Sequence, residues 1–421
     1  MQSIKTMLLR VIGIITLFGF TLFLTRNYSP KIIGQYDFIR TYLLVVGTIC
    51  LLGTEQSILY FAGIIKGKGS TVDLKNIYLK KVTLLLITSL LSLGALFIIG
   101  DKLINDFFND VLIFPILFKA TSCLFFFGLT TLNTEVFRAL DKIYIAELFR
   151  NTLKYLSVII GAVFLLNIHK EYYLVDTFLI GFVFLAIISL IMIISIFNKK
   201  IKNESENEKL RYSHKEIIVK SYPMAISGMA FFLLISFDIM LLKKHFGNET
   251  VAYYSTAIKL MTILAMIIIS INITVSTKIA EYYSSNKIVE LKEIIKKTSR
   301  LIFLFTFPIT IFICVFSDFI LSVFGKNYNQ AQYPLIILMF GQAICSMFGS
   351  SPIYLNMTGR QKIFQNILLI AVGINFFSNF FLIPIYGMVG AAISFVISLF
   401  FWNITVAIIV YRKDKIRIFL S

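Results

Sequence analysis

Long apolar runs alternate with short polar breaks along this chain of 421 residues. A membrane-spanning helix needs about 20 mainly apolar residues, and twelve runs fit that length. They cover residues 7–25, 36–62, 82–100, 111–132, 153–168, 174–197, 222–242, 251–277, 301–317, 333–356, 363–383 and 388–411. We therefore predict an all-α polytopic membrane protein with about twelve transmembrane helices.

The composition supports this prediction. Hydrophobic residues make up 58% of the chain and charged residues 15%, with a mean hydropathy of +0.85, whereas soluble domains are normally about a quarter charged. Lys5 and Arg10 precede the first run, which continues into "LTRNYSP" without the small-residue cleavage site of a signal peptide. We expect an uncleaved first helix.

The basic residues predict the orientation of the helices. With the N-terminus inside, the inner segments hold 30 of the 40 Lys and Arg residues and the outer segments hold 10. Short loops rich in Lys and Arg stay on the cytoplasmic side. Both termini are therefore predicted to be cytoplasmic.

The chain also contains a weak internal repeat. Residues 24–44 resemble 241–261 with an offset of 218 (254 − 36), and residues 141–149 resemble 360–368 with an offset of 220 (362 − 142). The longest polar segment, 198–220, lies at the midpoint. We predict an N-terminal six-helix lobe (1–197), a cytoplasmic linker (198–220) and a C-terminal six-helix lobe (221–421), related by a pseudo-two-fold axis along the membrane normal.

Charges inside the apolar runs are the candidate functional residues. If residues 36–62 form one helix, Asp37 and Glu55 are about five whole turns apart and point the same way, and Arg40 lies about 60° from them. A charge that faces lipid costs at least about 2.5–3.5 kcal/mol at the helix centre. Such a polar face should point toward protein or a water-filled cavity.

The repeat extends this pattern to both lobes. Arg26 aligns with Lys244, and Arg40 falls within one position of Lys259. We predict a net positive path for an anionic substrate, with candidate cations at Arg26, Arg40, Lys119, Lys244 and Lys259. The candidate ion-coupling acids are Asp37, Glu55 and Asp238.

Plainer interpretations stay open for several of these charges. Arg26, Lys243 and Lys244 can reach the membrane interface with long side chains. Asp37 and Arg40 have the i, i+3 spacing of a helical ion pair. Glu135, Arg138 and Asp141 are expected to be structural or gating groups, and Lys119 and Lys259 are the cations placed deepest in the runs.

Other chemistry has little support. The net charge of +18 is spread over many inner loops, so no nucleic-acid partner is expected. The four Cys residues lie in apolar runs without C-x-x-C spacing, and the three His residues are isolated in loops. No glycine-rich phosphate loop occurs. We predict neither a metal site nor a cofactor, and no enzyme active site.

Three stretches near the C-terminus carry a family resemblance. They are "SVFGKNYNQAQYPLIIL" (322–338), "MTGRQKIFQN" (357–366) and "NFFSNFFLIPIYGMVGAAISFVIS" (375–398). In this order they resemble the polysaccharide exporters of the multidrug/oligosaccharidyl-lipid/polysaccharide superfamily, and most of all the Wzx-type O-antigen or repeat-unit flippases. In the first half, "YSPKIIGQYDF" agrees with this resemblance.

The resemblance implies a fold like that of the MATE transporters, with two lobes that alternate between inward and outward openings. It also implies a bacterial inner-membrane location and an undecaprenyl-diphosphate-linked oligosaccharide as substrate. A polysaccharide polymerase and a chain-length regulator are the implied partners, besides the lipid bilayer.

Alternative functions remain at this stage. A multidrug or cation antiporter would share the two-lobe build but would more naturally present acids to its substrate. An O-antigen polymerase would need a large outer loop, and an acyltransferase a His within the membrane; neither is present. The glycan and the driving force, whether protons, sodium or the membrane potential, stay open.

Overall fold

The computed structural model of the chain describes residues 2–68, 71–201 and 212–416, and every regular element in these ranges is helical. The chain forms two compact units, Met1–Met229 and Ala230–Ser421. Much of the linker predicted at 198–220 lies outside the described residues. Residues 214–229, which begin helix α10 (His214–Ser284), group with the first unit, although the rest of α10 belongs to the second.

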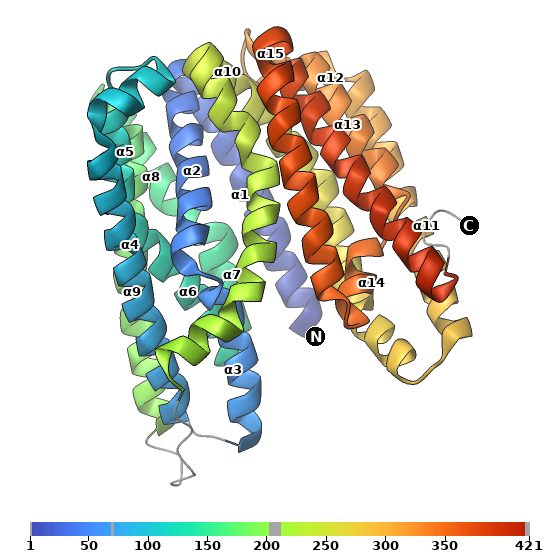
Figure 1. Cartoon of the computed structure of the whole chain (residues 1–421). Helices are drawn as coiled ribbons and strands as arrows, with labels where there is room; N and C mark the ends of the chain where they lie inside the picture. The colour runs from blue at the N-terminus through green and yellow to red at the C-terminus, as the bar shows by residue number, and fades with distance from the viewer. Residues whose placement is uncertain (1, 69–70, 202–211, 417–421) are drawn as a thin grey trace. The chain divides into compact units, whose positions relative to one another are not determined.

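The first unit is built around α6 (Leu124–Ala139), which packs against α2, α3, α4 and α9. Figure 1 shows its helices running alongside one another. The other elements are α1 (Gln2–Asn27), α2 (Pro30–Leu51), α3 (Thr54–Lys68), α4 (Thr71–Phe108), α5 (Ile113–Ser122), α7 (Ile143–Leu148), the π-helix η1 (Phe149–Leu153), α8 (Lys154–Asn167), the 3-10 turn η2 (Glu171–Tyr173) and α9 (Leu174–Ile201).

The second unit follows a similar course with fewer and longer helices. After α10 come α11 (Ile288–Val315), α12 (Ser317–Phe324), the 3-10 turn η3 (Tyr328–Ala331), α13 (Gln332–Ser346), α14 (Ser351–Met357) and α15 (Gln361–Asp414). The bent pair α13–α14 corresponds to the bent pair α5–α6 of the first unit. The helices that follow these pairs begin at Ile143 and Gln361, 218 residues apart (361 − 143). This spacing matches the sequence repeat.

The described residues accommodate the twelve predicted spans. Six helices are long and apolar enough to cross a membrane, and three bent pairs bring the number to nine. Two of the six, α10 and α15, are broken at Gly247 and Gly387 and hold two spans each. The shorter apolar segment Ile12–Asn27 supplies the remaining span. A bilayer admits such helices because each one satisfies its own backbone hydrogen bonds.

The second predicted helix is broken, which corrects the sequence analysis. α2 ends at Leu51, Leu52 and Gly53 have left-handed backbone conformations (φ 49° and 70°), and α3 starts at Thr54 with a bend of 46°. A Cβ atom on Gly53 would lie only 2.5 Å from the Ala225 backbone nitrogen of α10. The predicted continuous helix is therefore wrong, and the common direction of Asp37 and Glu55 no longer follows from it.

The glycines of "GMVGAA" have the structural role that their sequence indicates. Gly387 adopts φ 55°, a conformation that favours glycine, and turns the chain between the two halves of α15. A Cβ atom on Gly390 would lie 2.3 Å from the Leu382 carbonyl oxygen. The backbones of the two halves therefore approach each other at this turn.

Candidate functional site

The structure separates the predicted site residues into buried and surface charges. Asp37, Glu55, Asp238 and Lys259 are buried, and Arg40 is largely buried. Arg26 is exposed in the last turn of α1, and Lys244 is half-buried shortly before the break at Gly247. These two positions suit side chains that extend to the membrane interface.

In the first unit, α2 holds an ion pair between Asp37 and Arg40. The Arg40 Nε atom lies 3.4 Å from Asp37 Oδ1; the aspartate side chain is fully buried, whereas that of the arginine is 23% exposed. The preceding Tyr36 is buried with its ring edge-on to those of Phe20 and Phe178. The pairing that the i, i+3 spacing allowed is therefore present, and part of the arginine side chain stays accessible.

Lys119 is not an interior cation as predicted. Its side chain is 52% exposed, and Nζ lies 2.6 Å from Asp176 Oδ1, at the start of α9. This pair joins α5 and α9 within an open pocket that both side chains line. The proposal below therefore rests on the buried cations.

In the second unit, α10 carries a buried acid and two buried cations. Asp238 is fully buried, and its Oδ2 atom accepts a hydrogen bond of 2.7 Å from the Tyr254 hydroxyl. Lys243 and Lys259 are also buried on this helix. By the repeat offset of 218, Asp238 and Tyr254 correspond to Phe20 and Tyr36. The tyrosine at this repeat position thus contacts an aromatic ring in the first unit (Tyr36) and a carboxylate in the second (Tyr254).

Two buried asparagines of α15 extend this polar region. Ala230 and Leu234 of α10 pack with Leu368 and Ala371 of α15, and the rings of Phe237 and Phe376 are 5.2 Å apart, so the two helices run side by side in the same direction. Asn375 immediately precedes Phe376, and Asp238 immediately follows Phe237, so the two lie at the same level. Asn379 lies about one turn farther along α15.

The Asn379 amide donates to Asn375 Oδ1 at 3.0 Å. Asn375 Nδ2 and Asn379 Oδ1 have no hydrogen-bond partner within the described ranges. Both residues belong to "NFFSNFF", which the sequence analysis used only for the resemblance. Their i, i+4 spacing in an apolar run was the available signal.

Lys81 is a buried cation that the sequence analysis missed. The predicted spans 36–62 and 82–100 leave Lys81 in the segment between them, but α4 already begins at Thr71 and Lys81 is 0% exposed. Its Nζ atom donates to the Thr54 carbonyl at 2.8 Å and to Ser57 Oγ at 2.5 Å. Ser57 Oγ is in turn 2.6 Å from Ser221 Oγ of α10. Lys81 thus ties together α3, α4 and the start of α10 beside the break at Gly53.

Glu55 lies in the same region, in the first turn of α3. It is buried and interacts electrostatically with Lys81. Its Oε2 atom has no hydrogen-bond partner among the residues that the structure describes. No group of three or more His, Cys, Asp or Glu side chains that could hold a metal ion occurs there either.

A second buried charge cluster lies at the end of α6. Arg138 contacts Glu135 and Glu147, each at 3.4 Å, and Arg150 of the π-helix pairs with Glu135. Asn151 donates to Glu147 at 2.8 Å. The structural interpretation of Glu135 and Arg138 is therefore supported. Asp141 is exposed in the following turn with φ 66°.

Arg360, from "MTGRQKIF", links three helix ends of the second unit. Its guanidinium forms two hydrogen bonds with Asp414 at the end of α15, and the Tyr354 hydroxyl donates to the same carboxylate at 2.7 Å. Arg360 also donates to the Tyr283 hydroxyl at 3.1 Å. This cluster joins the ends of α10, α14 and α15, so the motif has a structural role.

Known proteins resemble this chain in sequence. The MatE family model matches residues 223–381. The capsular polysaccharide biosynthesis protein CapF of Staphylococcus aureus is 29% identical over 246 residues, which cover 55% of this chain and 59% of CapF. The probable low-salt glycan biosynthesis flippase Agl15 of Haloferax volcanii is 27% identical over 165 residues, which cover 38% of this chain and 34% of Agl15. The matches thus span 59% or less of these relatives' own lengths.

Solved structures match almost the whole chain. The lipid II flippase MurJ in an inward closed conformation has a TM-score of 0.72 at 15% identity, over 97% of this chain and 87% of MurJ. An inward-facing multidrug resistance MATE family transporter of the MOP superfamily has a TM-score of 0.71 at 13% identity, over 99% of this chain and 98% of that transporter. The predicted MATE-like fold and the resemblance to this superfamily are confirmed. The chain is a polytopic membrane protein with the fold of transporters and flippases.

Proposed function

We propose that this protein moves an undecaprenyl-diphosphate-linked oligosaccharide, the repeat unit of a surface polysaccharide, across a bacterial cytoplasmic membrane by alternating access. The observation that carries the proposal is a buried cation in each unit of a flippase-like fold. These are Arg40 in the first unit and Lys259 in the second. CapF and Agl15, both named for polysaccharide or glycan biosynthesis, support the choice of substrate class.

The charges would act on the diphosphate head group. Burying a cation within a bilayer is expensive, so such cations usually mark a substrate or ion pathway. Several moderate attractions suit a transporter better than one tight clamp, because a site that binds too strongly retains its cargo. The pairing of Arg40 with Asp37 weakens the attraction of Arg40 for a further anion. The neutral amides of Asn375 and Asn379 offer free hydrogen-bonding capacity in the second unit.

The buried acids supply candidate sites for ion coupling. Glu55 is the strongest candidate, because its Oε2 atom is buried without a hydrogen-bond partner among the described residues. Glu55→Gln imitates the protonated acid at nearly constant volume. If transport and its pH dependence are unchanged in that variant, Glu55 has no coupling role.

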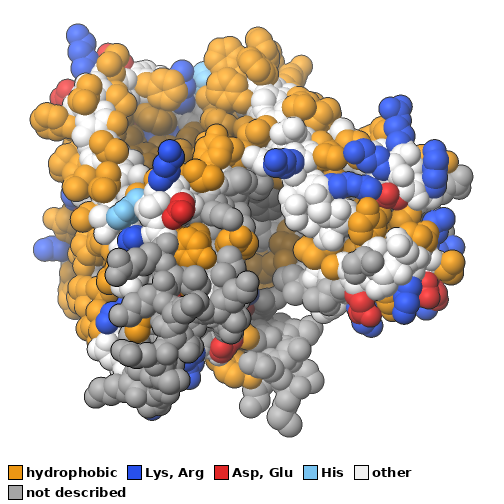
Figure 2. Space-filling model, turned by 60° about the horizontal axis from the view of Figure 1, so that its bottom comes forward, with side chains coloured by type: hydrophobic (Ala, Val, Ile, Leu, Met, Phe, Trp, Pro, Cys, Tyr) orange, Lys and Arg blue, Asp and Glu red, His pale blue; other side chains and the backbone are white. Residues whose placement is uncertain are grey.

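The predicted orientation belongs to the same proposal. In the second unit, exposed basic residues gather where α10 leads into α11 and where α15 ends; they include Lys287, Lys292, Lys296, Lys297, Arg412 and Lys413. Figure 2 shows basic side chains collected on this part of the surface and hydrophobic ones over the flanks. A reporter fused after Arg412 should be cytoplasmic, and one at Asn329 should be external.

A cation or drug antiporter is the second candidate function. The fully buried Asp238, which accepts a hydrogen bond from Tyr254, favours the antiporter, because a buried acid can exchange a proton for a cation. The two functions differ in which buried charge is essential. Lipid-linked glycan transport should require Arg40 and Lys259, whereas cation antiport should require Asp238 and tolerate loss of either cation.

The test is repeat-unit export in a strain that relies on this gene. Deletion should cause lipid-linked repeat units to accumulate on the cytoplasmic leaflet, and the parental gene should reverse the accumulation. Arg40→Ala and Lys259→Ala should fail to reverse it at normal protein levels, and Arg40→Lys should retain more export than Arg40→Ala. Lys119→Ala, which removes a surface cation, is the control.

Arg40→Ala removes the ion pair and keeps the buried charge of Asp37, so a second variant separates the effect of charge on export from its effect on stability. Asp37→Asn combined with Arg40→Gln removes both charges together. The proposal predicts that this double variant reaches the membrane but does not export. Export at the parental rate would show that Arg40 serves only its ion pair.

A further inference from the structure

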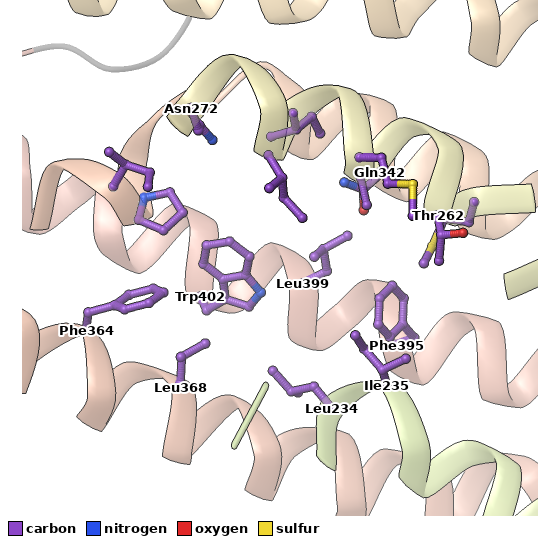
Figure 3. Close-up of a pocket in the computed structure, with 17 residues that line it drawn as sticks. Leu234, Ile235, Thr262, Asn272, Gln342, Phe364, Leu368, Phe395, Leu399 and Trp402 are labelled. Carbon is purple, nitrogen blue, oxygen red and sulfur yellow. The ribbon is translucent and has the colours of Figure 1, made fainter. Parts of the chain in front are cut away.

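The second unit contains a partly open cavity of about 450 Å³ between α10, α13, α14 and α15. This volume falls within the range of about 300–1,000 Å³ that is usual for ligand sites. Figure 3 shows the 17 lining residues, of which Thr262, Asn272 and Gln342 carry the polar groups apart from the Trp402 indole. The remaining side chains are aliphatic or aromatic.

Two of the three polar side chains already have partners. The Thr262 hydroxyl donates to the Lys259 carbonyl at 2.5 Å, and Asn272 Oδ1 accepts from Ser350 Oγ at 2.6 Å. Neither group therefore requires a polar ligand. The cavity is suited to an apolar one.

The cavity is elongated. Along α10 its lining extends from Met261 to Asn272, which corresponds to about 16 Å at 1.5 Å per residue. In Figure 3, Thr262, Gln342 and Phe395 lie toward one end, Asn272 and Phe364 lie toward the other, and Leu399 lies between them. A chain-like ligand fits this shape better than a compact one.

Buried charges stand next to one end of the cavity. Lys259 precedes the lining residue Thr262 by less than one turn of α10, and Asp238 follows the lining residue Leu234 by about one turn. Both are buried, as is Lys243. Two lysines and one aspartate make this region net positive. An amphiphile with an anionic head and an apolar chain matches this order of a net positive region followed by an apolar cavity.

We propose that this cavity binds the first isoprene units of the polyprenyl carrier, those next to its phosphate group. This inference rests on the proposed function and adds a site for the lipid part of the substrate within the second unit. The head group lies near Lys259, and the chain runs along α10 toward Asn272. A phospholipid acyl chain is the competing occupant that the experiment must exclude.

The chain provides its own reporter for this site. Trp402 is the single tryptophan of the protein and lines the cavity, with its ring 6.0 Å from that of Phe364. A brominated chain quenches tryptophan emission only at close contact. Quenching of the intrinsic fluorescence therefore measures occupancy without a label on the protein.

The experiment uses the purified full-length protein in lipid nanodiscs. Polyprenyl phosphate that carries bromine on the isoprene units next to the phosphate is added at increasing mole fraction. Dibrominated phosphatidylcholine is tested in parallel. We expect saturable quenching by the polyprenyl probe, reversal by unlabelled undecaprenyl phosphate, and only proportional, non-saturating quenching by the phospholipid.

Filling the cavity tests the location. Ala265→Phe projects a ring into the cavity from α10, whereas Leu369→Phe adds a ring at an exposed position of α15 and is the control. The saturable component should fall at least fivefold in Ala265→Phe and persist in Leu369→Phe. If Ala265→Phe does not fold, Ala265→Met is the smaller replacement, with an expected loss of at least twofold.

Several results would overturn the inference. They are the absence of saturable quenching, equal saturable quenching by the phospholipid, or unchanged quenching in a folded cavity-filled variant. These outcomes are distinct from failure of the proposed function. Quenching without export in the deletion strain would refute the function alone, and export without saturable quenching would refute the site alone.

Discussion

Lys81 should stabilise the first unit more than any surface lysine of α4. Lys81→Met removes the ammonium and keeps an apolar side chain of similar length. The Thr54 carbonyl and Ser57 Oγ each lose a donor, and the charge of Glu55 loses its neighbour. Removing one partner of a buried charge pair costs about 3–5 kcal/mol.

At the size of the first unit, a loss of that order lowers the apparent melting temperature by roughly 10 °C. Buried cysteines provide the assay, because a thiol-reactive dye labels them only on unfolding. Cys50 and Cys123 are buried in the first unit, so a background with Cys314→Ser and Cys345→Ser reports that unit alone.

Lys75→Met is the matched control, because Lys75 lies on the same helix and its ammonium donates to Asn198 at the exposed surface. It should change the free energy of unfolding by no more than about 0.5 kcal/mol. Adding Glu55→Gln to Lys81→Met should recover part of the loss, because it removes the uncompensated charge. If Lys81→Met and Lys75→Met melt alike, Lys81 does not hold the broken helix in place.

Two further predictions concern structural contacts. Gly53→Ala should lower the yield of folded protein, because its Cβ atom would lie 2.5 Å from the Ala225 nitrogen at a left-handed backbone position. Gly63→Ala is the control, because its Cβ atom would meet no atom within 4 Å. Equal yields of the two variants would contradict the close contact. Arg360→Ala should destabilise the second unit by about 1.5–3 kcal/mol, because it leaves Asp414 without its charged partner. The measurement is the temperature at which the buried Cys345 becomes labelled. Labelling of the variant at the parental temperature would contradict this prediction.

The apolar pattern was sufficient to predict the helices and several of their ends. A run of about 20 apolar residues has few alternatives in a bilayer, because each helix must satisfy its own backbone. The run 82–100 ends at Gly100, where the structure shows φ 78°, and Gly387 falls between the last two predicted spans. Local sequence encodes these features.

The errors arose where distant segments decide the structure. The stretch "LLGTEQ" reads as continuous apolar helix, and its break depends on the backbone of Ser221 and Ala225, about 170 residues away in sequence. Lys119 is neutralised by Asp176 from another helix. Neither contact could be derived from spacing along one run.

The other charged contacts also divide into those within one helix, which the sequence could predict, and those between separate spans, which it could not. The Asp37–Arg40 pair was predictable as one alternative, because both residues lie on one helical turn. The contact between Tyr254 and Asp238 joins the two halves of α10 across the break at Gly247. The two residues lie on separate predicted spans, and no spacing along one run links them.

Reconstituted flipping tests the proposed function most directly. The purified protein is placed in liposomes with a fluorescent undecaprenyl-diphosphate oligosaccharide, and a membrane-impermeant quencher reports how much remains in the outer leaflet. The parental protein should equilibrate the probe between leaflets, and Lys259→Ala should slow the exchange at least tenfold, equivalent to about 1.4 kcal/mol in the barrier. If the parental protein exchanges the probe no faster than protein-free liposomes, or if Lys259→Ala exchanges it at the parental rate, the proposed role of the buried cations in lipid-linked glycan transport is wrong.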